Sequence, residues 1–443
     1  MNVGSTGVGV LLCCGAGVSA EEVGGAPALV VDDLCRSPGA ASAALRELGV
    51  SRVVLGLCEP RAARDLVASL RRAGAEPFGI ETVTLGSRAG VPRALAAAVA
   101  KLRALPPGEP ERTTISGGAL SRRSLFRAAV VDHAPVAAID EAACVGSGRC
   151  GVCVEVCPAG AIAARAGAPA VDASACTACA DCVVRCPVSA IHLSGSSPAQ
   201  LEAQLGRLLE DCDGVVLGCA NAGATAPEGW ALVELPTLRL VTPGWLLQIR
   251  ALGRQAGLAP CDGPCCAGAA AVEAFAGRLR PAVLPEGARV RLAEPAATVE
   301  ACEPDAGAGP IVDSASPLGL LELRPGRCTL CGACAAHCPT GALRLEEGDD
   351  GTRLTFDHAA CTGCNRCSSV CPEDAVTVAR GVDQQLLGAR RELVTSVRET
   401  CEVCGEALPP LPLRRRLREL LPELAGSSLE TCAVCARRDA GTR

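Results

Sequence analysis

Over residues 1–105, short apolar runs alternate with segments whose apolar residues recur at helical spacing. The runs are GVGVLLCC (7–14), ALVVDDLC (28–35), SRVVLGLC (51–58) and PFGIETVTL (77–85). The segments between them begin near a proline and end at a glycine, which suits the two ends of a helix. Strands and helices in alternation predict an α/β layer domain with a parallel sheet.

The α/β pattern returns after residue 195, and each α/β region is followed by a segment dense in cysteine. Stretches rich in Pro, Gly and Ser separate the parts. We therefore expect an α/β multidomain chain in which two α/β layer domains alternate with two cysteine-dense modules. The predicted order is an α/β domain (1–105), a linker (106–135), a first module (136–195), an α/β domain (196–302), a linker (303–318), a second module (319–380) and a tail (381–443).

Cysteine restricts the function more than any other residue. The chain of 443 residues has 30 cysteines, and many of them fall in C-x-x-C steps. Disulfide frameworks are typical of small secreted chains, whereas such steps in a long chain favour metal thiolates. Thiolate ligands need a reducing compartment, so we expect a cytoplasmic protein.

Charge, hydropathy and the absence of one motif argue against three classes of partner or cofactor: nucleic acids, membranes, and flavin or nicotinamide cofactors. The formal net charge is −6, which offers a nucleic acid no general electrostatic attraction. No apolar stretch is long enough and free enough of charge to span a bilayer. The sequence has no strand–GxGxxG–helix unit with a distal acidic residue, so the usual fingerprint of a flavin or nicotinamide site is missing.

Three runs have the spacing C-x2-C-x2-C-x3-C-P without exception: CTACADCVVRCP (176–187), CTLCGACAAHCP (328–339) and CTGCNRCSSVCP (361–372). A four-iron cubane takes one thiolate on each iron. Two-residue spacings let three consecutive cysteines surround one cluster, while the fourth cysteine reaches the second cluster of a pair. Zinc knuckles are the competing interpretation, but three complete runs favour iron–sulfur clusters.

A fourth run, CVGSGRCGVCVEVCP (144–158), departs from this spacing. Its last three cysteines fit the end of the pattern, but Ser147 stands where the first belongs, and Cys144 lies three residues earlier. The glycines on both sides of Ser147 would give a longer loop the flexible backbone it needs. We expect a four-iron cluster that uses Cys144; serine ligation and a three-iron cluster are the alternatives.

The four runs and the segments after them, such as CPTGALRL and CPEDAVTV, resemble bacterial two-cluster ferredoxins. The resemblance implies two ferredoxin-like 2[4Fe–4S] modules, in which each cluster takes three cysteines of one run and the Cys-Pro cysteine of its partner run. The implied ligand sets are Cys328, Cys331, Cys334 and Cys371; Cys361, Cys364, Cys367 and Cys338; Cys176, Cys179, Cys182 and Cys157; and Cys144, Cys150, Cys153 and Cys186.

Cysteines also end three of the predicted strands in the N-terminal domain, where ligands gather in open parallel sheets. The segments DLCRSPG, GVSRVVLGLCEPR and RRAGAEPFGIE resemble the N-terminal domain of the flavin-containing subunit of heterodisulfide reductase, without its flavin domain. This resemblance implies a further cluster on Cys13, Cys14, Cys35 and Cys58. The first two are adjacent here, where the family separates them by one residue, and buried apolar thiols are the alternative.

The middle domain, with GVVLGCANAGA and PCDGPCC, weakly resembles the hydrogenase delta iron–sulfur subunit. That family holds a two-iron cluster with four cysteines, but Ala222 and Pro243 stand at two positions where ligands are expected. A docking domain without a cluster is one interpretation. A rearranged metal site is the other, and it would use Cys219, Cys261, Cys265 and Cys266.

In the tail, two C-x-x-C pairs flank a predicted helix. A tetrahedral S4 site suits structural zinc, so we expect a zinc-ribbon-like knuckle on Cys401, Cys404, Cys432 and Cys435. A rubredoxin-like iron is the alternative. The four histidines share no ligand spacing, and we expect His337 and His358 to be ordinary loop or surface residues.

Together these features predict an iron–sulfur electron-transfer protein, without catalysis of its own, that passes single low-potential electrons between redox partners. The resemblances imply partners such as a hydrogenase, a formate dehydrogenase or a flavin-containing subunit like that of heterodisulfide reductase. Two alternatives are a subunit of a disulfide or heterodisulfide reductase complex that uses the extra cysteines, and a redox sensor whose labile cluster controls a partner.

Overall fold

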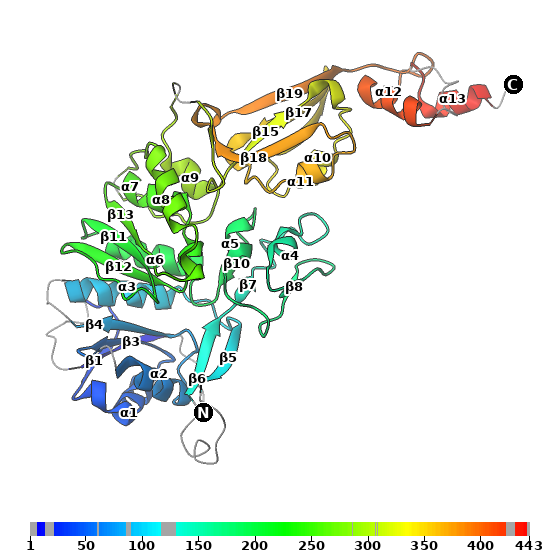
Figure 1. Cartoon of the computed structure of the whole chain (residues 1–443). Helices are drawn as coiled ribbons and strands as arrows, with labels where there is room; N and C mark the ends of the chain where they lie inside the picture. Colours follow the sequence, from blue (N-terminus) through cyan, green and yellow to red (C-terminus); the bar gives the residue numbers. More distant parts are fainter. Residues whose placement is uncertain are drawn as a thin grey trace. The chain divides into compact units, whose positions relative to one another are not determined.

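The computed structural model describes residues 7–13, 22–59, 62–85, 90–116, 130–285, 287–305, 307, 309–421 and 430–440. The chain divides into two compact units (Figure 1). The first comprises residues up to 144 together with 152–302, and the second comprises 145–151 together with 303–443. The first unit therefore holds both α/β regions and most of the first cysteine-dense module.

The N-terminal part of the first unit contains the predicted parallel sheet. Its elements are β1 (Val8–Cys13), β2 (Ala28–Val31), α1 (Pro38–Leu48), β3 (Arg52–Leu57), α2 (Ala63–Arg72), β4 (Ile80–Thr84) and α3 (Val91–Arg103). The strand order is β2-β1-β3-β4, and the two central strands are buried along their whole length. This burial follows from helices on both faces, with α1 and α2 on one and α3 on the other.

The stretch 106–135, expected to be a linker, contains two antiparallel strands, β5 (Glu111–Ser116) and β6 (Val130–Pro135). The guanidinium of Arg112 donates a hydrogen bond to the carbonyl of Cys176, at 2.7 Å. The expectation was wrong because the Pro, Gly, Ser and Arg content of this stretch predicts a loop, whereas its Thr and Val residues pair. The ladder lies against the first cysteine-dense module.

The first cysteine-dense module is built from very short elements. They are β7 (Ala137–Ile139), α4 (Val152–Val156), β8 (Ile162–Ala163), β9 (Ala170–Val171), α5 (Asp181–Arg185) and β10 (Ile191–Leu193). β7 pairs antiparallel with β10, and β8 with β9. The module therefore consists of two strand–helix–strand halves, and its small core includes cysteines of both halves.

The middle α/β region has a parallel sheet with the strand order β12-β11-β13. Its elements are α6 (Pro198–Leu208), β11 (Gly214–Cys219), β12 (Trp230–Leu235), α7 (Pro243–Ala251), β13 (Gln255–Ala259), α8 (Ala269–Arg278) and α9 (Ala296–Ala301). Helices α3 and α6 pack against each other between the two sheets (Figure 1). Arg93 of α3 donates a hydrogen bond to the carbonyl of Asp211 at 2.6 Å. The two α/β regions thus belong to one compact unit.

The second unit contains two three-stranded antiparallel sheets, β14-β18-β15 and β16-β17-β19. Its elements are β14 (Ile311–Val312), β15 (Gly319–Leu323), α10 (Ala333–Ala336), β16 (Leu343–Gly348), β17 (Gly351–Asp357), α11 (Arg366–Ser369), β18 (Val376–Val382), β19 (Arg390–Val397), α12 (Leu411–Leu420) and α13 (Ala433–Ala440). β14 and β19 are edge strands from the expected linker and tail, so the second module extends beyond its expected limits. The charged residues of β19 suit an edge strand but weaken its signal in the sequence.

Candidate metal centres

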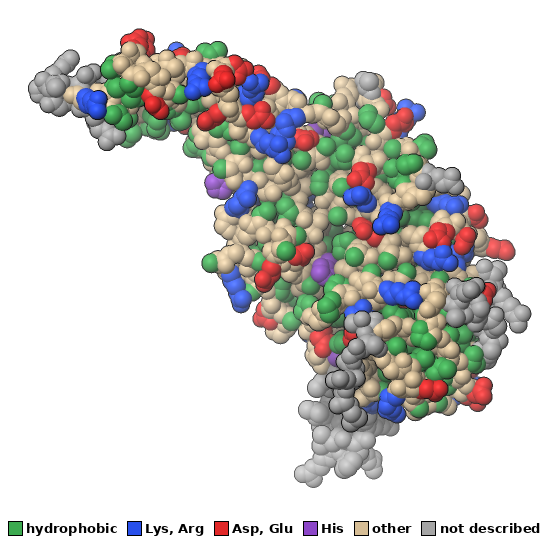
Figure 2. Space-filling model, turned by 180° about the vertical axis from the view of Figure 1, so that it is seen from behind, with side chains coloured by type: hydrophobic (Ala, Val, Ile, Leu, Met, Phe, Trp, Pro, Cys, Tyr) green, Lys and Arg blue, Asp and Glu red, His purple; other side chains and the backbone are tan. Residues whose placement is uncertain are grey.

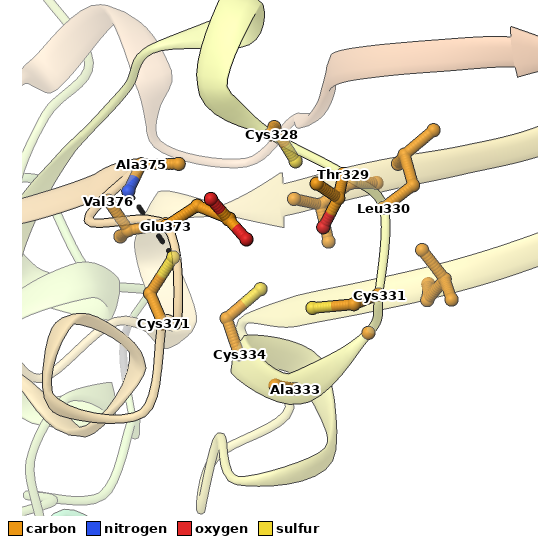
Figure 3. A pocket seen from close by; sticks show the side chains of 13 residues that line it. Cys328, Thr329, Leu330, Cys331, Ala333, Cys334, Cys371, Glu373, Ala375 and Val376 are labelled. Carbon is orange, nitrogen blue, oxygen red and sulfur yellow. Dashed lines mark hydrogen bonds between the residues drawn. The ribbon is translucent and has the colours of Figure 1, made fainter. Parts of the chain in front are cut away.

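One run of the second module and one cysteine of its partner run surround a single cavity. Cys328 and Cys331 come from the loop that leads into α10, and Cys334 lies in the first turn of α10. Cys371 comes from the end of the other run. Figure 3 shows the four sulfurs directed toward the space between them. The space free of protein atoms is about 360 Å³, and besides Thr329 and Glu373 its other walls are apolar or glycine: Leu330, Gly332, Ala333, Leu345, Leu354, Ala375 and Val376.

The same module contains a second cavity, in which the two runs exchange roles: the second run gives three cysteines and the first run gives one. Cys361, Cys364 and Cys367 belong to the loop and first turn of α11, and Cys338 is the last cysteine of the other run. The free space there is about 320 Å³. Each run therefore gives three cysteines to one cavity and its last cysteine to the other.

The first module repeats this arrangement once more. Cys176, Cys179 and Cys182 line a cavity together with Cys157 from the preceding run, and the space free of protein atoms there is about 320 Å³. Cys153 is buried, and its charge contributes to the raised pKa of Cys182, whose largest cause is burial. We call the four cysteines around each of these three cavities a cavity set.

The three complete runs share the same backbone conformation around their second cysteine. In each run the residues on both sides of the second cysteine have positive φ angles, between 55° and 78°. A left-handed backbone costs a non-glycine residue about 1–2 kcal/mol, so its recurrence indicates a functional constraint. Such conformations form concave nests of N–H groups that bind anions, including iron–sulfur clusters. The residues are Ala178, Ala180, Leu330, Gly332, Gly363 and Asn365.

A hydrogen bond to sulfur recurs at the end of the runs. All four runs continue as C-P-x-x-A, and the four alanines are buried. Hydrogen bonds to cluster sulfurs help to set the reduction potential. The sites expected from the sequence do not include the backbone N–H groups of these alanines as donors, although the repeated C-P-x-x-A pattern is visible in the sequence. The N–H groups of three alanines donate to the preceding cysteine: Ala161 to Cys157 at 3.3 Å, Ala190 to Cys186 at 3.2 Å, and Ala375 to Cys371 at 3.3 Å (Figure 3).

Burial makes bare thiolates unfavourable in the cavity sets. Loss of hydration, with the charge of neighbouring cysteines, raises the pKa of Cys182, Cys334 and Cys361 to about 12. Buried thiolates need compensating positive charge, which iron supplies. The donor atoms and the apolar walls of each cavity set therefore fit a bound iron–sulfur cluster.

The run with the displaced first cysteine is less regular. Burial raises the pKa of Cys186, and the negative charge of nearby Cys144 raises it further. After Cys144 the chain turns at Gly146, which has a φ of 85° and whose carbonyl accepts hydrogen bonds from the N–H groups of Arg149 and Cys150. The extra residues of this run are thus taken up by a local turn.

Three further groups of cysteines have a different geometry. In the described part of the chain, these groups are the sets of metal-binding side chains whose ligand atoms all lie within 4.8 Å of one another. We call them compact groups. They are Cys13, Cys35 and Cys58; Cys219, Cys261, Cys265 and Cys266; and Cys401, Cys404, Cys432 and Cys435.

The N-terminal compact group lies at the carboxyl ends of the parallel strands. Cys13 is the last residue of β1, and Cys58 directly follows β3. The sulfur of Cys58 lies 3.2 Å from that of Cys13 and 3.5 Å from that of Cys35. Cys58 is exposed to solvent. Cys14, expected as a fourth ligand, lies outside the described residues.

The compact group of the tail joins two segments of the second unit. The sulfurs of Cys404 and Cys432 lie 3.7 Å apart, and the N–H of Cys432 donates a hydrogen bond to the sulfur of Cys401 at 3.2 Å. Cys435 lies in α13 and is buried. The described part of the tail contains β19 and the helices α12 and α13.

One histidine that was expected to be an ordinary loop or surface residue is buried. His358 is 1% exposed. Its Nδ1 lies 3.0 Å from the carbonyl of Gly319, and its Nε2 accepts a hydrogen bond from the N–H of Asp383 at 2.9 Å. Burial lowers the pKa of His358, which keeps the ring neutral with its proton on Nδ1. A surface position is therefore wrong for His358, because ligand spacing tests for a metal site and says nothing about packing.

Comparison with protein families places two matches on these modules. Residues 327–375 match the 4Fe–4S dicluster domain family and include all cysteines of the two runs of the second module. Residues 136–162 match a 4Fe–4S binding domain family and include the run with the displaced cysteine. The chain carries two 4Fe–4S ferredoxin-type domains. No curated protein matches it.

These domains and the cysteine groups are consistent with a role in iron–sulfur electron transfer.

Basic and acidic side chains are interspersed on the face of the molecule shown in Figure 2. Among the residues that the structure describes, no helix has both the length and the apolar character needed to cross a membrane.

Proposed function

We propose that the protein is an electron carrier that relays single low-potential electrons between redox enzymes through four [4Fe–4S] clusters. The observation that carries this proposal is the cavity set, which occurs three times with the same three-plus-one composition. In the second module the charge of Cys334, from one cavity set, contributes to the raised pKa of Cys367 in the other. Such proximity favours transfer of an electron from one cluster to its neighbour.

The fourth cluster of this proposal uses Cys144, Cys150, Cys153 and Cys186. The nearness of Cys144 to Cys186 supports it, and so does the family match that covers residues 136–162. The turn at Gly146 accommodates the longer spacing. Cys144 then replaces the cysteine that is missing at Ser147.

The tail is proposed to hold one more metal centre, a structural zinc ion. Its four cysteines offer S4 ligation within a small volume, which suits one tetrahedral zinc ion. Arg416 of α12 donates a hydrogen bond to Glu373 of the second module at 2.9 Å. A zinc ion would hold the two cysteine pairs together next to this helix.

The proposed partners are a hydrogenase, a formate dehydrogenase or a flavin-containing subunit like that of heterodisulfide reductase. The resemblances of the N-terminal and middle regions to subunits of such enzymes support this choice. Two two-cluster modules in one chain suit a carrier with separate docking sites for a donor and an acceptor.

A second candidate function is that of a subunit in a disulfide or heterodisulfide reductase complex. The observation that favours it is the N-terminal compact group, in which exposed Cys58 lies within 3.5 Å of two other sulfurs. A site open to solvent at the end of a parallel sheet is where a substrate would bind.

The acceptor to which the reduced, isolated chain gives its electrons distinguishes the two functions. Protein purified without air is reduced with dithionite, freed of excess reductant and mixed with either a one-electron acceptor protein or a disulfide. We expect reoxidation by the acceptor and no reduction of the disulfide beyond that by the Cys58→Ser variant. Electron transfer from the reduced wild-type chain to the disulfide, lost in Cys58→Ser, would refute the carrier proposal.

A further inference from the structure

The middle α/β region holds a compact group where its parallel sheet ends. Cys219 is the last residue of β11, and the strand register pairs Gly218 of β11 with Ala259, the last residue of β13. The loop that follows β13 therefore begins beside Cys219. This loop contains the other three members of the group, Cys261, Cys265 and Cys266.

The sulfurs of this group have the spacing of ligands to a single ion. The Cys261 sulfur lies 3.2 Å from that of Cys265, 3.5 Å from that of Cys266 and 3.6 Å from that of Cys219. The sulfurs of Cys219 and Cys265 are 3.7 Å apart. Four thiolates bound at about 2.3 Å to one tetrahedral ion lie about 3.8 Å from one another. A disulfide would need about 2.0 Å, so the distances fit a metal-binding group of free thiols.

The loop after β13 is shaped around these sulfurs. The N–H of Cys261 donates a hydrogen bond to the sulfur of Cys266 at 3.2 Å, and the N–H of Gly263 donates one to the sulfur of Cys261 at 3.4 Å. A Cβ at position 263 would lie 3.3 Å from the sulfur of Cys261 and 3.5 Å from that of Cys265. The hydroxyl of Thr237 donates to the carbonyl of Cys265 at 2.6 Å and anchors the loop. Glycine at 263 thus keeps the space beside the sulfurs clear.

A two-iron cluster does not fit this spacing. Such a cluster carries its four thiolates in two pairs on different irons, so sulfurs of different pairs lie farther apart than the ligands of one ion. All four sulfurs here lie within 4.8 Å of one another, which leaves space for a single ion at their centre. Cys219 and Cys266 are buried and the other two are half-buried, so the four ligands would close the site.

We propose that Cys219, Cys261, Cys265 and Cys266 bind one zinc ion, which fastens the loop after β13 to the end of β11. Closed sites with four cysteine ligands are typical of structural zinc. This proposal does not depend on the proposed electron-carrier function, because it concerns a different domain and different cysteines.

The test compares zinc and iron contents of the full chain, purified without air from cells supplied with both metals. The variants are Cys265→Ser and, as a matched control, Cys212→Ala. Cys212 is buried in the same domain and has no place in a compact group. We expect Cys265→Ser to lose about one zinc per chain and to keep its iron. The control should keep both metals.

Other outcomes overturn the proposal. Loss of about two iron atoms in Cys265→Ser would indicate a two-iron cluster, loss of one iron a mononuclear iron site, and unchanged metal an unliganded group. A fall in both metals would mean that the variant misfolds, and then a second variant decides. A chain with Cys58→Ser and Cys404→Ser, which disables the other two compact groups, must keep about one zinc bound by sulfur alone in X-ray absorption. A zinc-free chain refutes the proposal.

Discussion

The second ferredoxin-type domain and the middle α/β region use cysteine in two different ways. In the former, four cysteines surround about 360 Å³ of space free of protein atoms, and their sulfurs point into it from two runs, three from one run and one from its partner. In the latter, the sulfurs gather 3.2 to 3.7 Å apart at the end of a sheet. Under the two proposals, the number of metal atoms in each thiolate site follows from how far the backbone holds the sulfurs apart. Cysteine count alone does not decide it.

Loss of one ligand from a cavity set gives the largest expected effect. Cys334→Ala removes a buried cysteine that has three other cysteines around the same space. We expect the chain to lose about a quarter of its iron, because one of four clusters cannot assemble. Iron analysis against protein concentration measures this. Cys212→Ala is the control, because Cys212 belongs to neither kind of group, and it should keep all its iron. An equal loss in both variants would show that the loss does not come from removing a cluster ligand.

Cys144→Ala tests the irregular run. If Cys144 is the fourth ligand, the variant loses at least one iron atom from its cluster, and an oxidised three-iron species is the simplest product. Low-temperature EPR of the oxidised protein detects that species directly. A full complement of reduced [4Fe–4S] signal in Cys144→Ala would show that another group, such as Ser147, supplies the ligand.

A smaller effect is expected where the cavity set meets the backbone of β15. A Cβ on Gly319 would lie 2.5 Å from the Cα of Gly363 and 2.9 Å from the sulfur of Cys361. We therefore expect Gly319→Ala to lower the free energy of unfolding of the second module by about 1–3 kcal/mol. Gly326→Ala is the matched control, since no atom lies within 4 Å of the Cβ it adds. Denaturant titration of both variants measures the difference, and equal stabilities would contradict the close approach.

The smallest expected effect is a dependence of stability on pH through His358. Burial lowers the folded-state pKa below the ordinary value of 6.5. As the pH falls through 6.5, the unfolded chain takes up a proton that the folded chain cannot, so the stability present at pH 7 declines. We expect the unfolding temperature to drop by a few degrees more between about pH 7.5 and 5.5 in the wild type than in His358→Gln. Identical drops would show that His358 does not titrate on unfolding.

The cavity sets were accessible to sequence reasoning because three of four cysteines in each set fall within seven residues. Their fourth member lies before a proline in a partner run of the same kind, and the resemblance to two-cluster ferredoxins implies the pairing. The parallel N-terminal sheet was predictable for a similar reason, since β1 and β3 are continuous apolar runs of strand length.

Features that depend on long-range packing were harder to predict. Cys219 and Cys261 are separated by 42 residues, and only the register of β11 against β13 brings them together. β19 has three charged residues in eight and pairs only at an edge, so its sequence resembles a linker. His358 is polar, and its burial follows from backbone partners at Gly319 and Asp383 that no local pattern reveals.

The central claim is that the two ferredoxin-type modules hold four low-potential four-iron clusters. Iron content and EPR after dithionite reduction, measured together on the full chain purified without air, test it most directly. We predict at least about 16 iron atoms per chain and signals of reduced [4Fe–4S] clusters that account for about four electrons. A chain with about eight iron atoms or fewer, or one without these signals on reduction, would contradict the claim.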